Sequence, residues 1–112
     1  MAVPHAQPGQ AIDVRPLGAT LPQQQTTTLA KTDSLEIIRL VLPRDKNISE
    51  HRAPGPITLQ CLEGQVEITA LGNKLALEAG SLLYLEAGQP HSLHAQSDAS
   101  LLLTIMLPAR QR

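Results

Sequence analysis

Two histidines, His51 and His91, are the residues of this chain whose type and placement best suit chemistry. An imidazole can ligate a metal ion through a ring nitrogen, and it can give or take a proton near neutral pH. Gly64, Gly80 and Gly88 lie between them in the sequence, and this spacing predicts short strands of a small barrel. We therefore expect both rings at one mouth of that barrel, where they bind a ligand or a metal or act as acid and base.

A single cysteine and a third histidine lie near this pair in the sequence. Cys61 has no partner for an intramolecular disulfide, and its leucine neighbours predict a buried, inert thiol. It shares strand parity with Ile57, but it lies about 13 Å further along at about 3.3 Å per residue. His94 follows His91 by three residues, so on a regular strand it faces the other way, and we expect it at the surface.

The positioning elements are predicted to be strands, because glycines and prolines divide the chain into short apolar runs. The clearest run is 65–71, where Val66, Ile68 and Ala70 alternate with polar residues. The predicted strands cover residues 57–62, 65–71, 74–78, 81–85, 90–95 and 100–107, with weaker candidates at 10–16 (Gln10 to Pro16) and 26–30.

Two pairs of residues resemble the loops of β-hairpins. Glu63 and Gly64 precede the strand at 65–71, and Gly72 and Asn73 follow it. Glycine and asparagine tolerate the positive φ that two-residue hairpin loops require. The first three strands are therefore predicted to be consecutive antiparallel neighbours.

The segment 35–42 is ambiguous, because a serine precedes it and could cap a helix. Three of its residues are β-branched and Pro43 ends it, which favours a strand.

Composition narrows the classes of partner. The chain has 112 residues, 42% of them hydrophobic, and Tyr84 is the single residue among Phe, Trp and Tyr. The core must then be aliphatic, and aromatic stacking on bases is unavailable. A net charge of −1, with no basic stripe, argues against nucleic acid and anionic membranes as partners.

The length predicts one domain, at residues 10–112, preceded by an arm at residues 1–9 that contains two prolines and a glycine. The first residues lack the apolar stretch of a secretory signal, and the run 101–107 is shorter than the roughly 20 residues that span a bilayer. We expect a cytoplasmic protein that does not enter a membrane.

The region around His91 resembles the second motif of the cupin superfamily, G-x5-P-x-G-x2-H-x3-N. Gly80, Gly88 and His91 occupy their motif positions. Glu86 stands in place of the proline and Ala95 in place of the asparagine. The resemblance extends, more loosely, over about residues 35–107.

The first cupin motif, G-x5-H-x-H-x3-E-x6-G, is matched only at His51 and Gly64. Asp45, Ala53 and Ile57 replace the leading glycine, the second histidine and the glutamate. In metal-dependent cupins three histidines and that glutamate hold Fe, Mn, Zn or Ni. The resemblance therefore implies, at most, a weakly held divalent metal here, because two histidines leave most of the coordination sphere to water.

The resemblance implies an all-β fold, a double-stranded β-helix or jelly-roll barrel of the small RmlC-like type. It also implies a homodimer, as do the exposed strand edges that a partner strand would cover. It implies no single activity, because cupins include isomerases, dioxygenases, decarboxylases and sugar-binding modules.

Two hypotheses for function follow. In the first, the aliphatic interior and the histidine pair bind a small ligand that is mostly apolar or bears a carboxylate, with or without a weakly held metal. The alternative is a metal-dependent enzyme of dioxygenase or isomerase type, in which an unidentified group completes the ligand set. The sequence leaves open whether the chain is an enzyme. The predicted site residues are His51, His91, Ile57, Leu59, Cys61 and Leu93.

Overall fold

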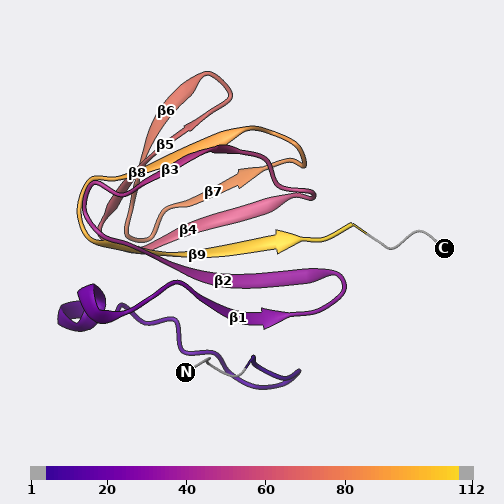
Figure 1. Ribbon diagram of the computed structural model, residues 1–112. Coiled ribbons are helices and arrows are strands. Elements are labelled where there is room, and N and C mark those ends of the chain that lie inside the picture. Colours follow the sequence, from indigo (N-terminus) through magenta and orange to yellow (C-terminus); the bar gives the residue numbers. More distant parts are fainter. Residues whose placement is uncertain (1–4, 109–112) are drawn as a thin grey trace.

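The computed structural model describes residues 5–108, which form two antiparallel sheets and one short helix (Figure 1). In chain order the elements are the 3-10 helix η1 (Gly18–Gln23) and the strands β1 (Thr27–Lys31), β2 (Leu35–Leu42), β3 (Asn47–His51), β4 (Ile57–Glu63), β5 (Gln65–Ala70), β6 (Asn73–Glu78), β7 (Leu82–Leu85), β8 (His91–Ala95) and β9 (Ala99–Met106).

The strands are arranged in the order β1-β2-β9-β4-β7 in one sheet and β3-β8-β5-β6 in the other. This arrangement confirms the all-β jelly-roll prediction. The strand predictions from residue 26 onward are confirmed within one residue at each end, and 35–42 is a strand. Within the described residues, no helix has the length and apolar character needed to cross a membrane.

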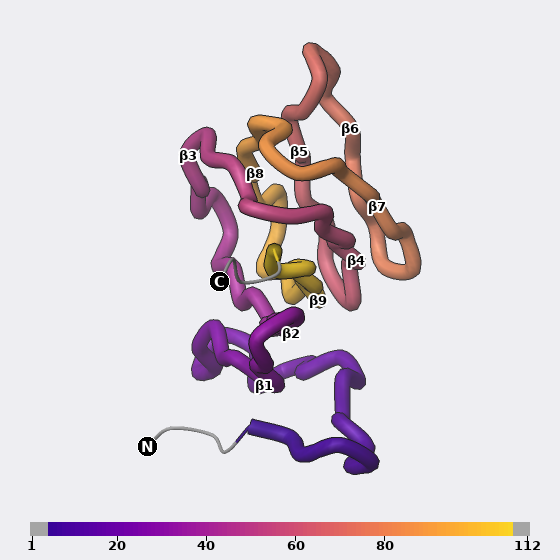
Figure 2. Tube along the Cα trace, turned by 90° about the vertical axis from the view of Figure 1, so that its right-hand side faces the viewer, coloured from indigo at the N-terminus to yellow at the C-terminus, as the bar shows by residue number. Residues whose placement is uncertain are grey.

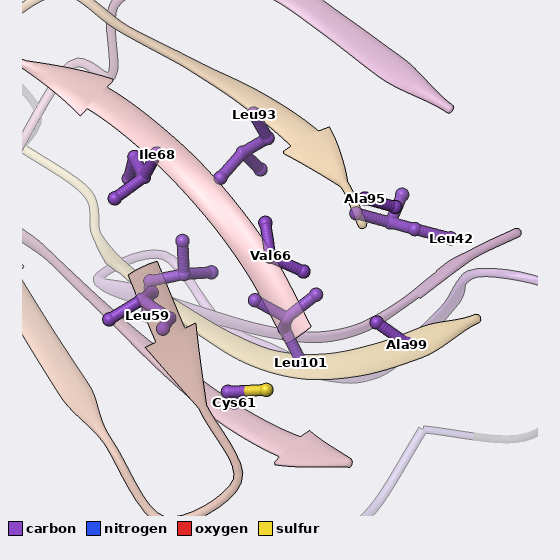
Figure 3. Close-up of a cluster of buried hydrophobic side chains, with 10 residues drawn as sticks. Leu42, Leu59, Cys61, Val66, Ile68, Leu93, Ala95, Ala99 and Leu101 are labelled. Carbon is purple, nitrogen blue, oxygen red and sulfur yellow. The ribbon is translucent and has the colours of Figure 1, made fainter. Parts of the chain in front are cut away.

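The core lies between the two sheets and is aliphatic, as the composition requires. Figure 3 shows inward side chains from both sheets packed against one another. Leu59, Ile68 and Leu101 are the largest of the fully buried ones. Cys61 is 0% exposed, and burial raises the pKa of its thiol. This supports the prediction of an inert cysteine, because a neutral thiol is a poor nucleophile.

The predicted hairpin at Glu63 and Gly64 is wrong. β4 pairs with β7 and β9, whereas β5 pairs with β6 and β8, so Gly64 is where the chain crosses from one sheet to the other. The second hairpin is confirmed, but its loop lies one residue earlier than predicted: Leu71 and Gly72, which both have positive φ, join β5 to β6, and Asn73 begins β6. Both places have a glycine with φ of +79°, and long-range pairing distinguishes them.

The predicted weak strand at 10–16 (Gln10 to Pro16) is also wrong. We call residues 10–23 the N-terminal segment. Figures 1 and 2 both show this part of the chain beside β1 and β2 at one end of the molecule. Arg39 of β2 donates hydrogen bonds of 3.1 and 2.9 Å to the carbonyl oxygens of Asp13 and Arg15. A side chain therefore satisfies backbone groups that a neighbouring strand would otherwise pair, and Pro16 has no N–H to offer.

Glu63 holds the end of the same segment. Its carboxylate accepts hydrogen bonds of 2.8 and 2.9 Å from the backbone N–H groups of Leu17 and Gly18, where η1 begins. The same carboxylate accepts a hydrogen bond from the hydroxyl of Ser100. The described part of the predicted arm is tied to β1 as well, because the N–H of Ala6 donates to the carbonyl oxygen of Leu29 at 2.8 Å. Residues 1–4 of that arm lie outside the described residues.

We expect Glu63→Gln to lower the free energy of unfolding at pH 7 by about 1–3 kcal/mol, because bonds to a charged acceptor weaken. Burial raises the pKa of this carboxyl, but its three hydrogen bonds and the nearby Arg39 charge outweigh that effect and hold the pKa below its ordinary value. The contribution is therefore present above the ordinary value of about 4.3 and is lost as the pH falls through the lowered value.

Urea unfolding of both proteins at a series of pH values from 7 downward tests this prediction. The difference between wild type and variant should shrink once the carboxylate of the wild type is protonated. A difference that stays constant down to the acid limit of folding would contradict the role of Glu63.

Candidate functional site

His51 and His91 lie side by side at one end of the barrel. His51 ends β3 and His91 begins β8, and the two residues are partners in the register of these strands. Their ring centroids are 4.2 Å apart, with an angle of 59° between the planes. His91 is 4% exposed and His51 is exposed at the rim, so the pair runs from the floor of the site to solvent.

A bulge in β3 puts His51 in this position. Ile48 pairs with Leu93, and His51 pairs with His91, so three steps along β3 correspond to two steps along β8. In a regular strand a residue three positions from Ile48 would face the opposite side. The extra residue restores His51 to the face that Ile48 occupies, which is a known effect of bulges near sites. The sequence predicted neither β3 nor its bulge.

Backbone carbonyl groups fix both imidazole rings. Nδ1 of His51 lies 3.0 Å from the carbonyl oxygen of Ser49, and Nδ1 of His91 lies 3.0 Å from that of Gln89. A carbonyl oxygen can only accept, so each Nδ1 carries the proton and donates it. In the neutral rings each Nε2 is then an acceptor, and neither bonds to another group in the described part of the chain. The pair presents two acceptor nitrogens.

These rings close one end of an apolar cavity of about 210 Å³. Among the predicted residues, Ile57, Leu59 and Leu93 line it together with the two histidines. The sequence reasoning missed Leu40, Ile48 and Leu103, which complete the lining. Leu40 and Leu103 lie on strands that the sequence predicts, and knowledge of which strands pair with β4 in the five-stranded sheet would have added them.

The structure does not bring Cys61 to this cavity. Its thiol donates weak hydrogen bonds to the carbonyl oxygens of Glu63 and Gly64, at 3.5 and 3.4 Å, where the chain leaves β4. Strand parity placed it on the correct face, but it lies beyond Leu59 in the closed part of the core (Figure 3).

The donors at the site do not fit a metal held by three or four protein groups. Among the described residues, no group of three His, Cys, Asp or Glu side chains is placed to share an ion. Glu50 and Glu86 are close to the histidines in the sequence, but their side chains lie away from the cavity. Glu50 lines a groove that also contains Glu67 and Lys74, and Glu86 accepts a hydrogen bond from Tyr84. Ile57 contributes only an apolar wall.

Two further residues, His94 and Tyr84, lie outside the cavity, and strand parity predicts this for His94. His94 points away from the cavity: its Nδ1 bonds to Asn47 Oδ1 at 2.7 Å, and its Nε2 is 3.7 Å from Asp45. Tyr84 is 57% exposed. Arg52 follows His51 in the chain and donates a 3.0 Å hydrogen bond to the carbonyl oxygen of Gly88, but it does not line the cavity.

Comparison with known proteins identifies the same fold. The family model for the cupin domain matches residues 38–107. A conserved protein of unknown function from Streptococcus pyogenes is 24% identical, with a TM-score of 0.75 over 98% of this chain and 97% of its own. A cupin superfamily protein from Desulfitobacterium hafniense is 19% identical, with a TM-score of 0.74 over 87% of this chain and 94% of its own.

An RmlC-like cupin from Shewanella frigidimarina is 17% identical, with a TM-score of 0.70 over 77% of each chain. No curated protein matches the sequence. At these identities the solved structures establish the fold and leave the ligand to be argued from the site.

Proposed function

This chain belongs to the cupin domain family, and from that premise we propose that it binds a small, mostly apolar ligand through one polar head group. The observation that carries the proposal is an aliphatic cavity closed by two imidazole rings whose free nitrogens are acceptors. Pockets of this kind, apolar with a few convergent polar groups, are typical of small-molecule sites.

The size of the cavity limits the ligand. Its volume of about 210 Å³ compares with roughly 150 Å³ for an engineered apolar cavity that binds benzene. A ligand somewhat larger than one benzene ring fits, with its apolar body against Leu40, Leu59 and Leu103. A sugar is disfavoured, because the lining offers no hydrogen-bonding side chain besides the histidines.

The histidine pair selects the head group. Two acceptor nitrogens favour a group that donates a hydrogen bond, such as a phenol, an alcohol or a protonated carboxylic acid. A carboxylate also fits beside an imidazolium ring, because a hydrogen bond between charged groups is stronger than one between neutral groups.

We expect His51→Ala and His91→Ala each to weaken the binding of phenol and hexanoate about tenfold or more, because each removes the partner of the head group. Titration of ¹⁵N-labelled protein with these two compounds, followed by amide chemical shifts around β3 and β8, measures the affinity. His94→Ala is the matched control, because this histidine lies on β8 but faces outward.

Saturable binding that both cavity-histidine variants retain at wild-type strength would refute the role of the pair. Absence of saturable binding for every apolar compound of this size would refute the proposed function itself.

The donor set does not favour the alternative of a metal-dependent dioxygenase or isomerase. That alternative requires a third protein ligand, and the described residues offer none beside His51 and His91. We therefore propose a binding protein.

We also propose that two copies associate through the outer face of the five-stranded sheet. Leu82 and Tyr84 of the edge strand β7 are 61% and 57% exposed on this face. Cross-strand register continues the face through Gln60 to Leu102 and through Thr58 to Thr104. None of these side chains is charged, so a second copy meets no like-charge repulsion when it packs on the same surface.

We expect wild-type protein to sediment as a dimer at micromolar concentration and the double variant Leu82→Glu, Tyr84→Glu to sediment as a monomer, because two copies would then oppose their charges. Leu71→Glu, Leu75→Glu is the control, since Leu71 and Leu75 are also exposed but lie at the β5–β6 end of the other sheet. A monomeric wild type, or dissociation by the control variant, would contradict the proposed face.

A further inference from the structure

A second, larger cavity lies outside the barrel, where the N-terminal segment meets the outer face of β1 and β2. Its volume is about 450 Å³. Arg39 lines it, whereas its neighbour Leu40 on β2 faces the inner cavity of the histidines. The two cavities are therefore on opposite faces of one sheet. The residues lining the outer one are Asp13, Arg15, Pro16, Leu17, Thr20, Gln24, Gln25, Thr27, Leu29 and Arg39.

Arg39 is the unusual member of this lining. It is only 6% exposed, yet within the described residues no carboxylate oxygen lies within 4.0 Å of its guanidinium group. Its partners are two backbone carbonyl oxygens, of Asp13 and Arg15. A buried charge is normally paired, because removal from water costs several kcal/mol per ion, and neutral carbonyl groups compensate it only in part.

The guanidinium group also has hydrogen-bond donors left over. It has five N–H groups, and the two carbonyl oxygens use two of them. In the described residues no fully buried side-chain nitrogen lacks a partner, so the unpaired Nε of Arg39 is reached by solvent. Since Arg39 lines the cavity, these donors are available to a molecule bound there.

The other charged residues of the lining favour a single negative charge on that molecule. Arg15 and Asp13 form an ion pair with each other at 2.8 Å, so among the lining residues Arg39 contributes the remaining positive charge. The Glu63 carboxylate also feels the Arg39 charge, but it lies outside the lining and accepts its hydrogen bonds from Leu17, Gly18 and Ser100. The carboxylate of Asp13 would repel a dianion. The amide side chains of Gln24 and Gln25 offer donors and acceptors for a hydroxyl group.

We infer that this outer cavity is a second binding site, in which Arg39 pairs with the carboxylate of a small hydroxy acid. A planar carboxylate can accept two parallel hydrogen bonds from a guanidinium group, which a phosphate dianion beside Asp13 or a chloride ion does less well. The inference does not depend on the ligand proposed for the histidine pair.

Glycolate is the test compound, added to ¹⁵N-labelled wild-type protein at constant ionic strength. We expect saturable shifts of the Arg39 Nε–H signal and of the amides of residues 13–29, with no shifts at His51 and His91. Chloride and inorganic phosphate should give at least about tenfold weaker effects. Shifts that do not saturate, or that chloride reproduces, would overturn the proposal.

Variants distinguish specific binding to Arg39 from general electrostatic attraction of an anion. Arg39→Met should abolish the saturable shifts, whereas the double variant Asp13→Asn, Arg15→Gln, which removes an exposed ion pair without changing the net charge of the lining, should change the affinity less than about threefold. Equal losses in the two variants would overturn the inference. If Arg39→Met fails to fold, the titrations of the wild type and of the double variant Asp13→Asn, Arg15→Gln still decide the question. His91→Ala should leave glycolate binding unchanged, which keeps this test distinct from that of the histidine site.

Discussion

Gly64→Ala is expected to lower the free energy of unfolding by about 3–5 kcal/mol. This loss is the sum of two costs: the left-handed backbone conformation that alanine would have to adopt, and the steric overlap of its Cβ with neighbouring atoms. Gly64 has φ of +79°, a conformation that costs alanine about 1–2 kcal/mol. A Cβ there would also overlap the carbonyl oxygen of Asp98 and come within 2.8 Å of the Cα of Ala99. Both are backbone atoms at the start of β9, so the relief of this clash must move a central strand.

Gly72→Ala is the matched control for this prediction. Gly72 has the same φ of +79°, but a Cβ there meets nothing within 4 Å. The loss expected at Gly72 is therefore about 1–2 kcal/mol, from the backbone alone. Urea unfolding of the two variants measures both losses, and their difference isolates the steric clash. Equal losses would contradict the account of Gly64 as a tight crossing between the sheets.

The comparison of these two glycines also shows what the sequence could predict. Each glycine adjoins a run of alternating polar and apolar residues, and the sequence predicts a hairpin loop at each. The alternation identified the strands correctly, because it depends only on which side of a strand is buried. Whether β4 pairs with β5 depends on β7 and β9, which follow β5 in the chain, and local turn residues carry no information about them.

The same division holds for the site. Strand parity correctly placed Ile57, Leu59 and Leu93 at the cavity and turned His94 away from it. Parity gives the face of a strand but not the depth at which a cavity closes, so it cannot show that Cys61 lies beyond the cavity in the core. The inward position of His51 depends on a bulge, and the course of the N-terminal segment depends on Arg39 and Glu63. Irregular pairing and side-chain to backbone bonds leave no periodic trace in a sequence.

Leu59→Ala is expected to destabilise the protein by about 2–5 kcal/mol while enlarging the site, because Leu59 belongs to both the core and the cavity wall. It is 2% exposed and packs where the cavity of about 210 Å³ ends. Truncation should extend that cavity toward the core. A ligand one ring or a few carbons larger than the wild type accepts should then bind and restore part of the lost stability, since binding to the folded state stabilises it by mass action.

Leu101→Ala is the control that distinguishes the role of Leu59 in core packing from its role in the cavity wall. Leu101 is 0% exposed in the same core but does not line the cavity, so a similar loss of stability is expected without any change in ligand size. Thermal unfolding of both variants with phenol and with 2-naphthol measures the difference. Stabilisation of Leu59→Ala by the larger compound, absent in Leu101→Ala, would show that the apolar cavity is the binding site. Identical responses of the two variants would show instead that these compounds bind elsewhere, and the histidine pair would lose its proposed ligand.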